Sequence, residues 1–295
     1  MAIFEISNGR LTVSVDSRGA ELKSLRKAES GKEYMWCADA RYWGRTSPTL
    51  FPLVGGLKNG EYRFDNKIYK MEKHGFVRDA EFKLVSHEAT EVWFTLEEDE
   101  ETKKQFPFSF QLKIGYRLED TTLRVLWRVD NPSAGPLCFS IGGHPAFNCP
   151  VNRGEKREDY FLKFDKQDEI SCTVIGEDGL VSDGKRNYKL QDGLLPISEE
   201  LFERDAIIME DYQIHSIALL TPDKKPYITT RFDLPVVAVW APAGKNAPFV
   251  CIEPWNGICD HTDFAGTLEE RKWGNKVQPG MSFASGYDIT VEEYE

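Results

Sequence analysis

The sequence contains no long hydrophobic run. None of its apolar segments approaches the about 20 residues that a membrane-spanning helix needs. Its start, MAIFEISNGR, also lacks the charged region and apolar core of a secretory signal peptide. We therefore expect a cytoplasmic protein that does not bind a membrane.

Positive charge is also in deficit. The chain has 37 lysines and arginines against 48 aspartates and glutamates, which gives 295 residues a formal net charge of −11. A chain of this charge is not expected to bind nucleic acid or an anionic membrane as its main partner. A small anionic ligand is still allowed, because a few local cations can outweigh the global field.

Cysteine and histidine are scarce, with six and five copies. No two cysteines form a C-x-x-C pair, and the closest two, Cys251 and Cys259, lie eight positions apart. A structural zinc site is therefore not expected. Because no secretory signal is present, we expect reduced, buried thiols rather than disulfides.

Helical periodicity is nearly absent. Apolar and polar residues instead alternate, as in RLTVSVDS and EYRFDNKIYKM, and such segments recur with turn signals between them. This pattern predicts an all-β sandwich or barrel in one domain over 1–295. Short helices are expected only at 198–204, capped by Ser198, and at 267–272. The acidic run EEDEET (97–102) is expected to form a solvated loop or hairpin tip.

Three stretches combine ionisable groups with glycine or proline and aromatic residues. They are EKHGFVRD with His74 and Arg78, SIGGHPAFNCP with His144, and FVCIEPWNGICDHTDF with Glu253. Glycine and proline would hold His144 on a stiff bend. The end of an apolar strand would partly desolvate Glu253 and raise its pKa toward that of a general base. Each residue by itself is more often structural, so a functional interpretation depends on their combination.

In this combination the sequence resembles the aldose 1-epimerase (galactose mutarotase-like) family, and within it the LacX-type branch. The resemblance rests on five segments in a fixed order: LFPLVGGLKNGEY, HGFVRD, GGHPAFNCP, LFERDAIIM and IEPWNGICD. It implies an all-β galactose mutarotase-like β-supersandwich with few short helices and an open cleft for a sugar.

The resemblance also implies roles for individual residues. Glu253 would take the proton from the anomeric hydroxyl of a hexose, His144 would protonate the ring oxygen, and His74 would bind beside it. Asp205 would hold sugar hydroxyls. Further substrate contacts are expected from Arg78, Lys58, Phe76, Phe147 and Trp255.

The chemistry of anomer exchange fits such a pair. Ring opening needs one base and one acid on opposite sides of the sugar ring. A carboxyl group whose pKa is raised by burial can act as the base, and a histidine near its ordinary pKa of about 6.5 can act as the acid. Neither a metal nor a redox cofactor is required. Because each group reaches its own oxygen, we expect a gap of several ångströms between Glu253 and His144 in the empty cleft.

The sequence departs from the family at Gly56, where an arginine usually helps to hold the sugar. Nearby cations are Lys58, Arg45 and Arg78. Lys58 would replace the charge without a bidentate fork. The three cations also leave open a hexose 6-phosphate as substrate.

Two further alternatives remain. One is a non-catalytic carbohydrate-binding protein on the same scaffold. The other is a metal site formed by His74, His144 and Glu253. Its ligand spacing argues against it, because no two of these residues lie within one local segment. The sequence leaves the oligomeric state and the identity of the sugar open.

Overall fold

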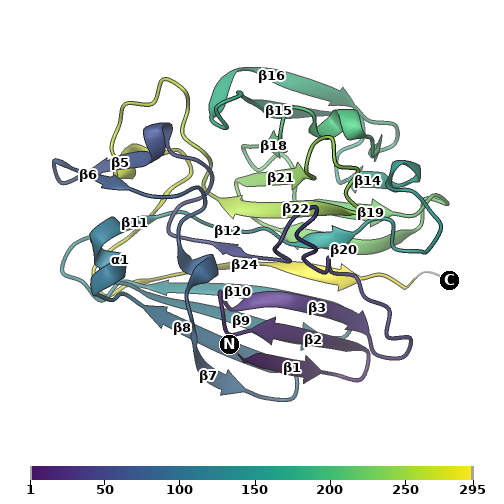
Figure 1. Ribbon diagram of the computed structural model, residues 1–295, viewed down its shortest axis with the longest axis horizontal. Coiled ribbons are helices and arrows are strands. Elements are labelled where there is room, and N and C mark those ends of the chain that lie inside the picture. Colours follow the sequence, from purple (N-terminus) through teal and green to yellow (C-terminus); the bar gives the residue numbers. More distant parts are fainter. Residues whose placement is uncertain (1, 294–295) are drawn as a thin grey trace.

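Antiparallel strands dominate the computed structural model, which describes residues 2–293 (Figure 1). The larger main sheet has nine strands in the order β17-β14-β19-β20-β24-β10-β9-β8-β7. In that order they span Leu194–Pro196, Phe161–Phe164, Ser216–Leu220, Pro226–Phe232, Ser282–Val291, Thr122–Asp130, Gln111–Glu119, Glu91–Glu97 and Lys83–His87. The all-β class predicted from the alternation is confirmed.

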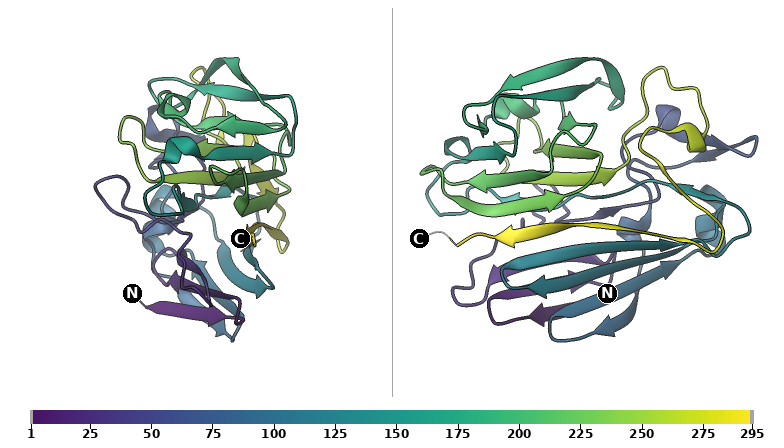
Figure 2. Two further views of the ribbon diagram at one scale, coloured as in Figure 1. Left: turned by 90° about the vertical axis from the view of Figure 1, so that its right-hand side faces the viewer. Right: turned by 180° about the vertical axis from the view of Figure 1, so that it is seen from behind.

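The second main sheet has the order β16-β15-β18-β21-β22-β12-β4, and β13 also pairs with β22. Its strands span Val181–Lys189 (β16), Glu169–Ile175 (β15), Ile207–Met209 (β18), Val236–Trp240 (β21), Phe249–Asn256 (β22), Ile141–Gly143 (β12), Thr49–Leu50 (β4) and Ala146–Asn148 (β13). This sheet lies above β24 in Figure 1, and Figure 2 shows the same two halves from the side and from behind.

Three small sheets and a few helical turns complete the fold. The remaining strands are Ile3–Ser7 (β1), Leu11–Asp16 (β2) and Glu21–Lys27 (β3) in one sheet, Glu61–Phe64 (β5) and Lys67–Lys70 (β6) in a hairpin, and Leu137–Phe139 (β11) with Asn275–Val277 (β23). The helical elements are α1 (Glu100–Gln105) and the 3-10 turns η1 (Lys58–Gly60), η2 (Val77–Asp79), η3 (Arg157–Asp159), η4 (Glu199–Phe202) and η5 (Leu268–Glu270). None of the helices within residues 2–293 is long and apolar enough to cross a membrane.

The acidic run at 97–102 corrects one expectation. Its second half is not a loop but the start of α1, because the Asp99 carboxylate accepts a hydrogen bond from the Thr102 N–H at 2.7 Å. The acidic residues of the first turn, Glu100 and Glu101, lie where the helix dipole favours negative charge. Capping therefore turns a charged run into a helix.

The other short helices are smaller than expected. Each is a single 3-10 turn, η4 within 198–204 and η5 within 267–272, and Ser198 makes no capping hydrogen bond with its side chain. All six cysteines are free thiols, as expected, and all are buried except Cys37, which is exposed.

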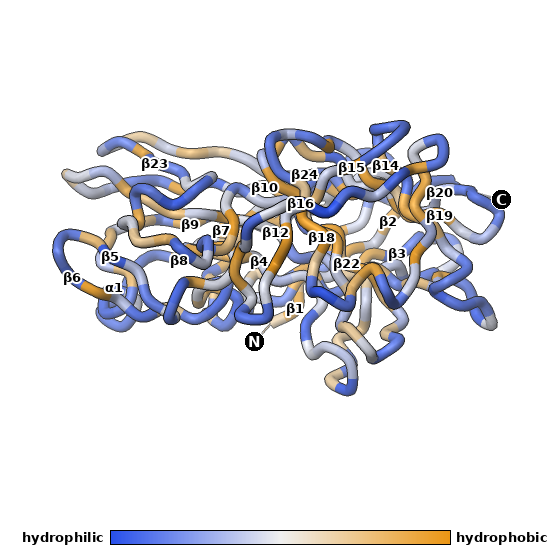
Figure 3. The backbone as a smooth tube through the Cα atoms, turned by 90° about the horizontal axis from the view of Figure 1, so that it is seen from above, coloured by the Kyte–Doolittle hydropathy of each residue, from blue (hydrophilic) through white to orange (hydrophobic). Residues whose placement is uncertain are grey.

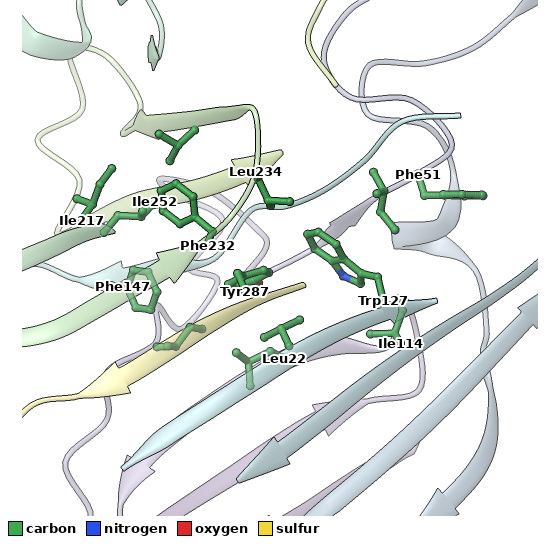
Figure 4. Packing of buried hydrophobic residues seen from close by; sticks show 14 of the residues in the cluster. Leu22, Phe51, Ile114, Trp127, Phe147, Ile217, Phe232, Leu234, Ile252 and Tyr287 are labelled. Atoms are coloured by element: carbon green, nitrogen blue, oxygen red, sulfur yellow. The ribbon is translucent and has the colours of Figure 1, made fainter. Parts of the chain in front are cut away.

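The main hydrophobic core lies between the two large sheets and the β1-β2-β3 sheet. Leu22, Trp127 and Ile252, one from each of these sheets, belong to one buried cluster (Figure 4). The Tyr116 hydroxyl also ties the small sheet to the nine-stranded one by donating to the Ala20 carbonyl at 2.7 Å. Hydrophobic segments concentrate in the strands and hydrophilic ones in many of the connections (Figure 3).

The two faces of strand β22 contact different groups of side chains: one face packs in this core and the other packs against smaller clusters. The strand is buried along its whole length, and successive side chains of a strand point to opposite faces. Val250 and Ile252 belong to the main core, whereas Cys251 and Trp255 belong to smaller clusters on the other face. Glu253, which lies between these two odd-numbered residues, therefore points away from the main core.

Candidate active site

The pairing of β22 with β12 and β13 places His144 beside Glu253. β12 pairs with Trp255 and β13 with Cys251, both in one antiparallel register. His144 lies midway between these two strands, so it falls opposite Glu253 in the same register. The next residue, Pro145, accepts a hydrogen bond from the backbone of β22 at 3.2 Å. The bend SIGGHPAFNCP thus continues a strand pairing and also presents an imidazole.

His144 and Glu253 are in direct contact. Nε2 of His144 lies 3.2 Å from Oε2 of Glu253, and the two side chains are only 10% and 2% exposed. The expected gap of several ångströms is therefore wrong for the empty cleft. Cross-strand neighbours have Cβ atoms about 4.5–5.5 Å apart, which brings the ends of two long side chains into contact.

Burial sets the protonation of this pair. It raises the pKa of Glu253 well above 4.5. Burial also lowers the pKa of His144 to about 3, with the positive charges of Lys73 and Arg78 acting in the same direction. The expectation of a histidine pKa near 6.5 is thus corrected, because desolvation disfavours the imidazolium ion. In the empty site, burial therefore favours a neutral imidazole and a protonated carboxyl group.

Aromatic rings fix the orientation of His144. The ring of Trp43 stacks on the imidazole with centroids 4.7 Å apart and an interplanar angle of 26°. Trp240, the last residue of β21, meets it edge to face at 5.6 Å. Sequence reasoning missed both tryptophans. The only signal for Trp43 in the sequence was its place two positions before Arg45.

His74 supplies a second imidazole to the site. Its ring lies 5.7 Å from that of His144 and nearly perpendicular to it. Nδ1 accepts a hydrogen bond from the Gly55 N–H at 3.2 Å, so the neutral ring carries its proton on Nε2. Burial, followed by the neighbouring His144, lowers the pKa of His74 well below 6.5. His74 is therefore a neutral hydrogen-bond donor rather than a cation.

Gly75, the residue after His74, packs closely against the backbone of Phe51, and a substitution tests this packing. Gly75 has φ +71°, and a Cβ atom there would lie 2.2 Å from the Phe51 carbonyl oxygen. We expect Gly75→Ala to destabilise the protein by more than the about 1–2 kcal/mol that a left-handed backbone alone costs, measured by urea unfolding. Gly9→Ala is the matched control, because Gly9 has φ +83° with nothing within 4 Å of the added Cβ. Equal losses in the two variants would contradict the close packing.

These side chains face a cavity of about 500 Å³ on the side of the eight-stranded sheet opposite the main core. Of the residues expected at the site, six line it: His74, Arg78, His144, Asp205, Glu253 and Trp255. Further lining side chains come from Trp43, Lys73, Ile175, Phe202, Ile208 and Trp240. The volume falls within the usual range for small-molecule sites.

Three expected contacts do not line the cavity. Phe147 is fully buried in the main core, because it occupies a core-facing position of β13. Phe76 packs against the same core, with its ring 6.4 Å from that of Phe110. Lys58 stands at the start of η1, where its backbone N–H donates to Asp260, and its side chain does not border the cavity. The structure therefore does not bring these three residues to the cavity.

Lys73 is the cation that sequence reasoning missed, although it stands next to His74. Its Nζ lies 3.7 Å from a carboxylate oxygen of Asp205, and both residues line the cavity. Arg45, by contrast, is held by Asp79 through contacts of 2.9 and 3.1 Å. The charge expected from Lys58 or Arg45 is thus supplied at the cavity by Lys73 and Arg78.

Several polar atoms in the cavity wall are buried without a hydrogen-bond partner in the structure. They are Arg78 Nε, His144 Nδ1, Glu253 Oε2 and Trp255 Nε1. Buried polar atoms are nearly always paired in proteins, and an exception calls for an explanation. Four exceptions around one cavity are typical of a site that completes its hydrogen bonds with a ligand.

Comparisons with known proteins identify the family and the fold. The aldose 1-epimerase family model matches residues 2–287. The chromosomal protein LacX of Lactococcus lactis subsp. lactis is 32% identical, over 97% of this chain and 98% of its own length. The crystal structure of a galactose mutarotase related enzyme from Lactobacillus acidophilus has a TM-score of 0.92 at 34% identity and covers 99% of this chain and 98% of its own.

A crystal structure of a galactose mutarotase-like protein from Lactobacillus casei ATCC 334 is also similar, with a TM-score of 0.90 at 28% identity. It covers 99% of this chain and all of its own. Sequence, fold and nearly full-length coverage therefore agree with one another, and the chain belongs to the aldose 1-epimerase family.

Proposed function

We propose that the protein is an aldose 1-epimerase that interconverts the α and β anomers of a hexose by acid–base ring opening. The observation that carries this proposal is the buried contact between His144 and Glu253 at the floor of a sugar-sized cavity. A protein that only binds a sugar has no need of a desolvated acid–base pair. The family membership supports the same reaction class.

The proposed reaction uses the single proton of this pair. On sugar binding the proton moves from Glu253 to His144 across their 3.2 Å contact. Glu253 then takes the proton of the anomeric hydroxyl O1, and His144 gives its proton to the ring oxygen O5. The C1–O5 bond breaks as the C1=O1 double bond forms. Rotation about C1–C2 and reversal of both transfers yield the other anomer.

The other side chains of the cavity bind and orient the sugar in this proposal. His74 donates from Nε2, Asp205 and Arg78 hold hydroxyls, and Trp255 covers an apolar face of the ring. Lys73 joins Asp205 at the wall. Because Trp43 packs on one face of His144, it holds the imidazole in line with Glu253.

A hexose 6-phosphate is the second candidate substrate, and Lys73 with Arg78 favours it. Both line the cavity, and Arg78 Nε has no hydrogen-bond partner. Polarimetry of freshly dissolved α-glucose, α-galactose and their 6-phosphates, with and without protein, distinguishes the two substrate classes. Failure to accelerate the rotation change of any of them would favour a carbohydrate-binding protein instead.

The pKa directions predict an unusually broad pH profile. The pair keeps one proton between the lowered pKa of His144, about 3, and the raised pKa of Glu253. On the acid side, activity should therefore fall only as His144 gains a proton toward pH 3, well below the pH at which an ordinary histidine titrates. The measurement is the initial rate above the buffer blank, with intrinsic fluorescence as a check on folding. A half-maximal rate near pH 6.5 would contradict the burial of His144.

A further inference from the structure

The proposed reaction leaves one ionisable neighbour of the acid–base pair unused, Cys251. It is fully buried, lies two positions before Glu253 on the same face of β22, and pairs with Ala146 of β13. Among residues 2–293, one ligand atom from each of Cys251, His144 and Glu253 lie within 4.8 Å of one another. This set differs from the metal site considered from the sequence, because Cys251 replaces His74.

The three donors are close to the geometry of a tetrahedral zinc site. Zinc binds thiolate sulfur at about 2.3 Å and imidazole nitrogen or carboxylate oxygen at about 2.0–2.2 Å, which places its donors roughly 3.4–3.7 Å apart. The donor atoms of the cluster, which lie within 4.8 Å of one another, therefore have to approach by up to about 1.1–1.4 Å. Two of its strand neighbours on this face are small, since Ala146 lies opposite Cys251 and Ala238 lies opposite Glu253, whereas Trp240 of β21 lies on the other side of Cys251.

Charge also favours a divalent cation at this place. On binding, the cation displaces the carboxyl proton of Glu253 and the thiol proton of Cys251, which leave to solvent. The resulting thiolate and carboxylate, with a neutral imidazole, compensate two positive charges, so the complex buries no net charge. His144 already offers a neutral ring, and its Nδ1 has no hydrogen-bond partner. The cavity provides access, because His144 and Glu253 both line it.

We propose that Cys251, His144 and Glu253 form an inhibitory site for a borderline-soft divalent cation of the zinc type. Three protein ligands leave the fourth position open toward the cavity. Hard cations such as Mg²⁺, which prefer oxygen ligands, should not bind there. Metal binding at this site is independent of the proposed epimerase activity. Only the expected loss of activity depends on that function, because the metal occupies the acid and base needed for catalysis.

The test uses the full chain without a histidine tag. Titration with Co²⁺ should produce the near-ultraviolet absorption of a cobalt–thiolate bond, and calorimetry should show one Zn²⁺ bound per chain. We expect Cys251→Ser, and Cys251→Ala as a second variant, to abolish the cobalt–thiolate band and weaken Zn²⁺ binding about ten-fold or more, because even loss of an outer-shell partner costs 10–100-fold. Cys259→Ser is the matched control, since Cys259 borders the cavity but lies outside the cluster.

The outcomes separate the two proposals. A cobalt–thiolate band that persists in both Cys251 variants, or disappears in Cys259→Ser, would overturn the site. Binding of Mg²⁺ as tight as that of Zn²⁺ would overturn its assignment as a soft-metal site. If Zn²⁺ binds through Cys251 but no hexose shows accelerated mutarotation, the metal site stands and the epimerase function fails. In an active enzyme, Zn²⁺ should raise the apparent KM for the sugar.

Discussion

Replacing Glu253 with glutamine is expected to lower kcat for hexose mutarotation by about 10²–10⁴-fold, the range for loss of a general base. Glutamine keeps the size of the side chain but cannot exchange the proton that Glu253 shares with His144. Sugar binding should remain detectable by calorimetry, because the rest of the cavity wall is unchanged. The rate is measured by polarimetry after subtracting the spontaneous reaction in buffer.

Stability is expected to change little, because burial already favours the uncharged carboxyl group of Glu253 and the amide is equally neutral and nearly the same size. Glu88→Gln serves as the control for the same chemical change on the exposed surface. Turnover of Glu253→Gln within a few-fold of the unchanged protein would remove Glu253 from the mechanism. Loss of sugar binding together with turnover would instead indicate that Glu253 mainly holds the substrate.

The second large effect is expected at His144. His144→Gln removes the group that exchanges the proton with O5, so kcat should again fall by about 10²–10⁴-fold. If Glu253 and His144 act as one unit, the double variant should be scarcely slower than either single variant, because losses in a catalytic unit are not additive. Polarimetry of the three variants measures both effects.

His87→Gln is the matched control, since His87 is exposed and its Nε2 lies 2.8 Å from the Glu5 carbonyl oxygen, outside the cavity. It should keep full activity. Losses that simply multiply in the double variant would show that His144 and Glu253 contribute independently. That result would contradict a shared proton.

Local patterns in the sequence predicted the strands better than the helices. Strict alternation in Leu11–Asp16 produced a strand whose even and odd positions differ in burial, as the pattern requires. The hairpin turn at Asp65 and Asn66 adopts positive φ at both residues, which suits two-residue hairpins. The helix that follows Asp99 was not predicted. Its start depends on a single capping contact, whereas the charge of the segment alone predicted a solvated loop.

Part of the site could also be predicted from local sequence patterns. Glu253, His144 and His74 stand out in the sequence because glycine and proline surround them. Phe147 was misplaced because one position along a strand reverses the face, and the bend at His144 hid which face Phe147 takes. Lys73 and Trp43 come from connecting segments, and only the packing of distant strands brings them to the cavity. A local sequence pattern does not predict contacts between segments that are far apart in the chain.

The shared register of β12, β13 and β22 also bears on how this protein can change during evolution. One residue inserted between Gly143 and His144 would turn the imidazole to the other face of the sheet. Two inserted residues would restore the face but move the imidazole away from Glu253. Insertions in the loops around the cavity rim carry no such constraint. The spacing of acid and base is therefore fixed by strand pairing, while the rim is free to diversify toward other sugars.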